Sequence, residues 1–256
     1  MKVTVLGCGS SVGTPAAGGY WGDCDPGNPK NERTRASLLV QKNDTDILID
    51  TTYDLRTQLN SVEQTMLDAV LLSHAHSDHI NGIDDLRVIS YQKGDPLPAY
   101  TNQSTMNDLK SRLTYIFDGG GGGIYKPFLT ENIIEESGTV DIQGVPVTVF
   151  PQDHGTCTSL GFRIDDFAYS VDVKRLSEES LQALEGIDTW VVDAAGYHRE
   201  QMYTHATFKE MFKWVDRIKP RMTYLTVLTN FMDYETLCDE LPDHIRPAYD
   251  GMVLNF

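Results

Sequence analysis

The chain has 256 residues, 40% of them hydrophobic and 23% charged, which is typical of a globular protein and not of a disordered or fibrous one. Its 21 Lys and Arg against 37 Asp and Glu give a net charge of −16, which argues against broad electrostatic binding to nucleic acid or to an anionic membrane. No apolar run approaches the roughly 18 residues of a membrane span, and the N-terminal segment reaches Gly7 before a signal-peptide core develops. We therefore expect a cytoplasmic protein with one domain over residues 1–256. Its four cysteines form no CxxC pair, so we expect reduced thiols.

The first half of the chain predicts short strands and one helix. Residues 2–6, 37–41 and 46–50 have strand character, and the last two flank a polar turn of hairpin length at residues 42–45. A buried-type strand at 69–72 runs into a histidine-rich segment, and residues 80–91 carry apolar side chains at helical spacing. The glycine run at 119–123 predicts a mobile loop, with a substrate lid as the alternative.

The second half alternates strands with helices. We expect strands at 144–151, 160–164, 167–171, 189–192 and 222–226. A capped helix is predicted at 177–184, and an amphipathic helix at 204–218 ends before Lys219 and Pro220. Strands interleaved with helices in this way indicate a layered α/β architecture with mixed sheets.

Three imidazoles and a carboxylate lie within six positions directly after the strand at 69–72: His74, His76, Asp78 and His79. His74 and His76 alternate along an extended backbone and can face the same way, while Asp78 and His79 begin the predicted helix and can face a second point nearby. This spacing predicts two adjacent metal positions. The alternative is a set of polar loop histidines without a role.

Other candidates lie at predicted strand ends or helix starts. His154 follows a strand and supplies a further imidazole, although a single histidine is more often an ordinary hydrogen-bonded residue. Asp172 also follows a strand, where its carboxylate could bridge two cations or simply occupy a turn. His205 begins the predicted helix at 204–218. Asp50 and Asp193 are weaker candidates for orienting the ligands.

The segment from Leu72 to Gly82 resembles the HxHxDH signature of the metallo-β-lactamase superfamily. Further segments resemble its PhnP-like phosphodiesterase branch over nearly the whole chain: residues 7–11, 21–26, 28–31, 33–35, 83–87, 153–155 and 248–251. The resemblance implies an αββα four-layer sandwich with two divalent metal ions, zinc or manganese, at one edge between the sheets. It also implies a homodimer.

The resemblance assigns the site residues one by one. It implies that the first metal is held by His74, His76 and His154. The second metal takes Asp78 and His79, and Asp172 bridges the two. His205 matches the histidine that such enzymes place beside the leaving group, so His205 and Asp78 are the expected catalytic residues.

Two positions depart from the family pattern. Val227 stands where relatives carry a histidine or asparagine, and a valine cannot ligate a metal, so the second site is expected to be weakened, with Thr229 or Asn230 as poor substitutes. Cys24 stands alone where some relatives hold a structural zinc through a cysteine cluster, and we expect no such zinc here.

The expected reaction is hydrolysis of a small phosphodiester, cyclic or nucleotide-like, by a metal-bound hydroxide with His205 as general acid. The acidic net charge disfavours a nucleic acid substrate such as precursor transfer RNA. Arg33, Arg35 and Arg87 are either substrate contacts or structural ion-pair partners. Lactone or thioester hydrolysis at the same metals is an alternative, as is a non-catalytic metal-binding or nucleotide-binding protein.

Overall fold

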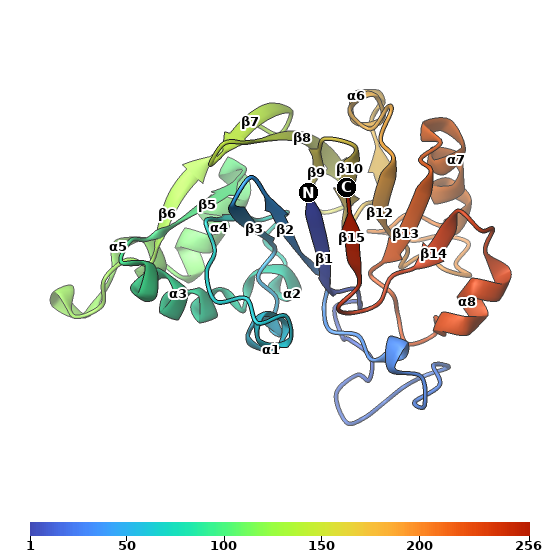
Figure 1. The fold of residues 1–256 in the computed structure, drawn as a ribbon, viewed down its shortest axis with the longest axis horizontal. Helices are drawn as coiled ribbons and strands as arrows, with labels where there is room; N and C mark the ends of the chain where they lie inside the picture. Colours follow the sequence, from blue (N-terminus) through green and yellow to red (C-terminus); the bar gives the residue numbers. More distant parts are fainter.

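A computed structural model describes residues 1–256 and contains two β-sheets (Figure 1). The first sheet consists, in spatial order, of β15 (Val253–Asn255), β1 (Lys2–Gly7), β2 (Ser37–Lys42), β3 (Thr45–Ile49), β4 (Ala69–Leu71), β5 (Leu97–Thr101) and β6 (Leu129–Ile133). The second consists of β11 (Arg175–Leu176), β8 (Val145–Asp153), β9 (Thr158–Ile164), β10 (Phe167–Ser170), β12 (Thr189–Asp193), β13 (Met222–Thr226) and β14 (Ile245–Pro247), with β7 (Gly138–Ile142) paired to β8. Both sheets mix parallel and antiparallel pairs.

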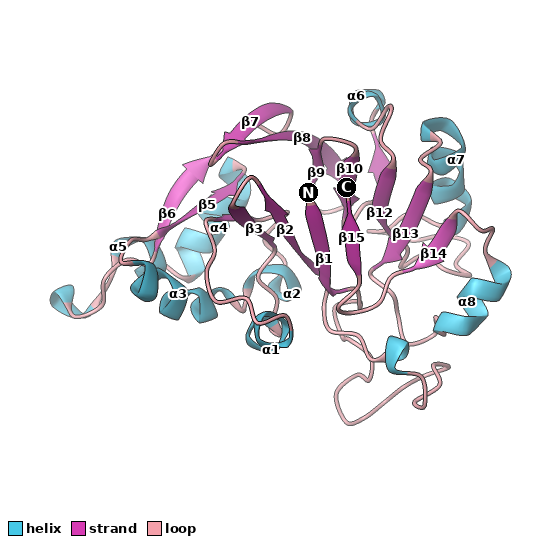
Figure 2. Ribbon diagram, in the orientation of Figure 1, coloured by secondary structure: helices cyan, strands magenta, loops and turns pink.

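Helices lie outside the two sheets (Figure 2). They are α1 (Leu55–Ser61), α2 (Ser77–Ile80), α3 (Leu86–Lys93), α4 (Gln103–Arg112), α5 (Tyr115–Asp118), α6 (Glu178–Ala183), α7 (Phe208–Ile218) and α8 (Tyr234–Glu240). Short 3₁₀ turns occur at Pro29–Asn31, Ile83–Asp85 and Gly121–Gly123. Helices α1, α3 and α4 pack on the first sheet, and α6, α7 and α8 pack on the second. The predicted αββα sandwich is confirmed.

Alternation along the strands separates two hydrophobic clusters. In β3, Ile47 and Ile49 belong to a cluster of 42 buried residues that joins the facing sides of the two sheets and continues beneath α6, α7 and α8. Leu48 points the other way, into a cluster of 18 buried residues beneath α1, α3 and α4. This period of two is what a strand covered on both faces requires. The hairpin between β2 and β3 turns through Asn43 and Asp44, both with positive φ, as a two-residue turn favours.

Two predicted helices have different boundaries in the structure. The helix expected at 80–91 is divided into α2, a 3₁₀ turn and α3. Gly82 lies at the break, where an added Cβ would meet the Thr52 carbonyl oxygen at 1.7 Å, so the chain turns against the sheet instead of continuing as a helix. The helix expected at 204–218 begins only at Phe208, because Thr207 and Glu210 form a capping box there.

The two termini are adjacent, since the Met1 amino group donates to the Phe256 carbonyl at 3.0 Å. The segment after α5 that contains the glycine run extends away from the body at the end of the first sheet (Figure 1). None of the helices has the length and apolar character that crossing a membrane would require.

Asp250 joins the C-terminal segment to two loops of the first sheet. Its carboxylate accepts hydrogen bonds from the Cys8 amide at 3.0 Å, the Thr34 amide at 2.7 Å and the Thr34 hydroxyl at 2.6 Å. Burial raises the pKa of Asp250 to about 6, although these hydrogen bonds favour the charged form and partly oppose burial.

This pKa predicts a pH dependence of stability. The folded state binds the Asp250 proton more tightly than the unfolded state, whose aspartate pKa is about 3.9. The contribution of Asp250 to the free energy of unfolding therefore falls as pH rises from about 4 to about 6. Urea unfolding of the wild type and Asp250→Asn across this range should show the wild-type advantage shrinking. An advantage that grows with pH would mean that the three hydrogen bonds outweigh burial.

Candidate metal centre

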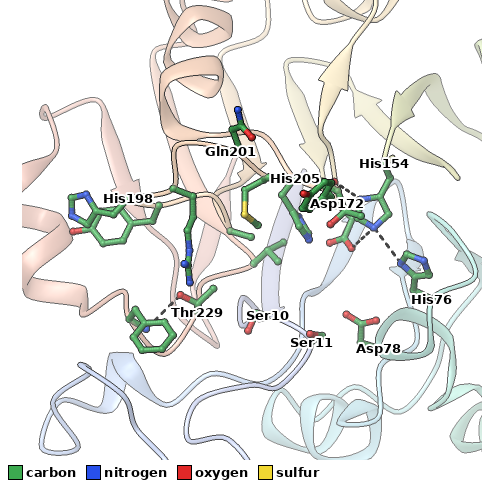
Figure 3. Close-up of a pocket in the computed structure, with 18 of the residues that line it drawn as sticks. Ser10, Ser11, His76, Asp78, His154, Asp172, His198, Gln201, His205 and Thr229 are labelled. Carbon is green, nitrogen blue, oxygen red and sulfur yellow. Dashed lines mark hydrogen bonds and ion pairs between the residues drawn. The ribbon is translucent and has the colours of Figure 1, made fainter. Parts of the chain in front are cut away.

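The candidate residues meet at one edge of the two sheets, where strands end. Asp50 follows β3, His74 lies three residues beyond β4, and His154, Asp172 and Asp193 end or follow β8, β10 and β12. Neighbouring parallel strands bring their carboxyl ends to the same edge, which is the usual location of sites in such sheets. Figure 3 shows His76, His154 and Asp172 facing one another across a cavity, with Asp78 opposite and His205 beside Asp172.

The first cluster contains three histidines and a carboxylate: His74, His76, His154 and Asp172. His154 Nε2 lies 3.1 Å from Asp172 Oδ2 and 3.2 Å from His76 Nδ1. His74 Nε2 lies 3.6 Å from the same Asp172 oxygen. The potential ligand atoms all lie within 4.8 Å of one another, so one cation could contact all four side chains.

The second cluster contains Asp78, His79 and Asp172. His79 Nε2 lies 3.4 Å from Asp78 Oδ2 and 3.5 Å from Asp172 Oδ1. Asp172 thus presents one carboxylate oxygen to each cluster. Its backbone has φ of 50°, a left-handed conformation that aspartate tolerates better than most residues and that places this side chain at the junction.

The chemistry of the buried atoms fits divalent cations. His74 Nε2 and Asp172 Oδ1 are buried without any hydrogen-bond partner, a costly state for polar atoms unless something else satisfies them. Burial lowers the pKa of His74 well below its usual value. Burial alone would raise the pKa of Asp172, but the neighbouring His79 and His154 hold it well below its usual range. Both groups are therefore in the deprotonated form that a metal ligand needs.

Asp50 fixes the orientation of the loop that carries the histidines. Its carboxylate accepts from the Ser73 amide at 2.7 Å and the Ser73 hydroxyl at 2.8 Å, and it lies 2.8 Å from His79 Nδ1. The last contact directs His79 Nε2 toward the second cluster. Burial lowers the pKa of His79, but the charges of Asp172 and Asp50 outweigh burial and raise it well above its usual value.

Two further contacts orient His154 and His205. His154 Nδ1 lies 2.6 Å from the Thr204 carbonyl oxygen, which leaves Nε2 toward the first cluster. His205 Nδ1 lies 2.6 Å from Asp193 Oδ2. Burial lowers the pKa of His205, but the charge and hydrogen bond of Asp193 outweigh burial and raise it to about 9.

Val227 lines the same cavity as Asp78 and Asp172. Its φ is 58°, a left-handed conformation that is unfavourable for a β-branched residue. Thr229 also lines the cavity, whereas Asn230 is buried and its amide donates to the Gly13 and Tyr20 carbonyls, each at 3.3 Å. Asn230 therefore holds a loop in place.

The three arginines proposed from the sequence do not line this cavity. Arg35 pairs with Asp54 at 2.9 Å, and Arg87 pairs with Asp84 at 2.6 Å. Arg33 is buried and donates to the Asn31 side chain at 2.9 Å. The structure therefore gives all three packing or ion-pair contacts away from the candidate metal ligands.

The cavity has a volume of about 870 Å³. One wall is the loop between β12 and α7, which includes Tyr197, Arg199, Gln201 and Met202. The residues of this wall were not predicted from the sequence, in which the loop is marked only by its position directly before His205. The glycine run at 119–123 contributes nothing to the lining.

The αββα sandwich and the paired His/Asp clusters at its edge define the class of metal-dependent hydrolases with the metallo-β-lactamase fold. A family model described as a beta-lactamase superfamily domain matches residues 45–226. A crystal structure described as a new diphosphatase from the PhnP family is 30% identical, covers 100% of this chain and 96% of its own, and has a TM-score of 0.89. The chain belongs to the metallo-β-lactamase superfamily and, within it, to the PhnP family.

Two curated relatives match this chain over only about half of their own length. An octanoyltransferase of Porphyromonas gingivalis is 30% identical over 98% of this chain but 51% of its own length. A ribonuclease Z of Bradyrhizobium diazoefficiens is 29% identical over 52% of this chain and 45% of its own length. The chain thus spans about half the length of these relatives.

Asp50→Asn should weaken metal binding without removing a ligand. The amide cannot accept from both Ser73 and His79, so His79 loses its fixed orientation, and such partners are typically worth roughly 10–100-fold in metal affinity. Competition with a chromogenic chelator measures the loss. Asp54→Asn, which changes only contacts with the side chain and amide of Arg35 outside both clusters, is the matched control. Equal affinities for both variants would exclude an orienting role for Asp50.

Val227→His should strengthen the second metal site. Histidine tolerates the left-handed backbone better than valine, and its imidazole adds a ligand on the wall beside Asp78. We expect a higher metal-to-protein ratio after dialysis, measured by elemental analysis. An unchanged ratio would show that the second cluster is complete without this position or that its geometry does not admit the added ring.

Proposed function

We propose that this protein hydrolyses a small phosphodiester, with divalent metal ions held by the two His/Asp clusters and His205 protonating the departing oxygen. The observation that carries the proposal is the position of His205. It lines the cavity together with Asp78, His154 and Asp172, and Asp193 holds its Nδ1, so that Nε2 is free to act.

Asp193 supports a proton-donating role for His205 over a ligating one. Asp193, His205 and Asp172 also form a potential metal group. However, Asp193 Oδ2 accepts from the Val173 amide at 2.9 Å as well as contacting His205, and Oδ1 accepts from the Ala195 amide at 2.9 Å. With its oxygens occupied, Asp193 stabilises a charged imidazolium, the form a general acid needs.

The two clusters would hold the metal ions that the reaction needs. When bound, the divalent ions supply an activated water and neutralise charge on the phosphoryl oxygens. The first ion would be held by His74, His76 and His154. The second would be held by Asp78 and His79, and Asp172 would contact both ions. Asp50 and the Thr204 carbonyl keep His79 and His154 aligned. Arg199 also lines the cavity and would contact an anionic substrate.

A small substrate fits the cavity and the charge of the protein. About 870 Å³ is within the range of small-molecule sites, and a net charge of −16 opposes a long polyanion. The similarity to a diphosphatase and to a ribonuclease Z supports attack at phosphorus. Both zinc and manganese suit the imidazole and carboxylate ligands.

Thioester or lactone hydrolysis is the second candidate, because one relative is an octanoyltransferase and the same metals can activate water toward a carbonyl. A thiolate leaving group, with a thiol pKa of about 8.5, departs without much help from an acid. An alkoxide leaving group needs the proton. The Asp193–His205 pair is therefore better explained by a phosphodiester than by a thioester. A lactone also releases an alkoxide, so turnover assays and not the general acid distinguish it from a phosphodiester.

His205→Ala should discriminate between leaving groups. We expect a loss of roughly 10²–10⁴-fold in kcat for an alkyl phosphodiester, because the alkoxide must be protonated. A much smaller loss is expected for bis(p-nitrophenyl) phosphate, whose phenolate departs unaided. Steady-state rates of metal-stripped protein after addition of zinc or manganese provide the measurement.

His244→Ala, which removes an exposed histidine outside the cavity, is the control and should match the wild type on both substrates. Equal losses on both substrates in His205→Ala would argue against the general acid. Turnover of thioesters but not of phosphodiesters would favour the second candidate.

A further inference from the structure

A second, basic pocket adjoins the candidate active site. It has a volume of about 450 Å³, and its walls carry four cations, Lys174, Arg175, Lys209 and Lys213. Only two carboxylates, Glu200 and Glu210, line it as well, and Glu210 already accepts from the Thr207 amide and hydroxyl, each at 3.2 Å. The chain has 16 more acidic than basic side chains, whereas basic side chains outnumber acidic ones around this pocket.

The arrangement of these cations works against the stability of the free protein. Lys209 and Lys213 are four residues apart on α7 and face the same side, where like charges repel. Lys209 also lies in the first turn, where the helix dipole disfavours a cation. Of the four cations only Arg175 has an ion-pair partner, Asp153 at 4.0 Å. An anion bound between them would relieve these costs.

The basic pocket and the catalytic cavity share a wall. Gln201, Met202 and Tyr203 line both of them. Lys174 is two residues beyond Asp172, and Thr207, which lines the basic pocket, is two residues beyond His205. Two residues of extended chain span roughly 7 Å, so the two pockets are neighbours on the His205 side of the metal clusters.

We propose that Lys174, Lys209 and Lys213 bind a second phosphate group of the substrate, on the leaving-group side of the phosphodiester that is cleaved. This inference rests on the proposed function for its orientation, because His205 marks the leaving-group side. The substrate class it names is a nucleotide-like diester whose leaving group carries a further phosphate. The selectivity for that phosphate comes from three lysines without ion-pair partners.

The test is a binding measurement, so it does not depend on turnover. Titration calorimetry of the metal-loaded protein compares adenosine 3′,5′-bisphosphate with adenosine 5′-monophosphate. We expect the bisphosphate to bind about ten-fold more tightly, as several partly exposed ion pairs would give. This preference should decrease between about 0.05 and 0.2 M salt.

A variant with Lys174→Gln, Lys209→Gln and Lys213→Gln should bind the monophosphate as the wild type does. It should lose the preference for the bisphosphate over the monophosphate. The matched control changes Lys2, Lys110 and Lys126 to Gln, which removes the same charge outside both pockets, and should keep it. An equal preference in both variants, or no preference in the wild type, overturns the proposal. Circular dichroism confirms that each variant is folded.

The outcome for hydrolysis is separate. If the preference is lost in the triple variant while no phosphodiester is cleaved by any form, the basic pocket remains a phosphate site and only the proposed reaction fails. If diesters are cleaved and the preference is the same in all three proteins, the reaction stands and the second phosphate site does not.

Discussion

The site depends on one shared carboxylate, because Asp172 offers a different oxygen to each cluster. For this to happen, the ends of β4, β8 and β10 must meet within a few ångströms, although they belong to two sheets. The hydrophobic cluster of 42 residues, which includes strands of both sheets, supplies that constraint. A close-packed core does not deform easily, so the positions of the ligands are set before any cation binds.

A second layer of carboxylates then determines what each histidine can do. Asp50 and Asp193 both follow or end a central strand and both contact the Nδ1 atom of an imidazole. Their partners differ in surroundings, since His79 faces Asp78 and Asp172, whereas His205 faces the cavity. Under the proposed function, the same pairing serves a ligating ring at His79 and a proton-donating ring at His205.

The sequence predicted most of what is local. Strand positions, the β2–β3 hairpin and the clustering of His74, His76, Asp78 and His79 follow from periodicity and spacing, and the resemblance placed the more distant residues in order. The sequence-based prediction was wrong where tertiary contacts set the end of an element. The Thr52 carbonyl packs against Gly82 and interrupts a helix that the apolar periodicity favours. The cap at Thr207 leaves His205 in a loop. The basic pocket was also missed, because its lysines come from two separate segments.

The local charge around the cavity is compatible with the anionic substrate that the proposed function requires. The net charge of −16 belongs to the chain as a whole, and at about 0.15 M ionic strength charges are screened beyond roughly 8 Å. A phosphate in the cavity therefore responds mainly to its immediate surroundings, which are the metal clusters, Arg199 and the neighbouring lysines. Distant carboxylates do not prevent binding there, but they disfavour a long polyanion that must extend over them. Under the proposed function, the acidity of the whole chain and the cations near the cavity together favour a short substrate with two phosphate groups.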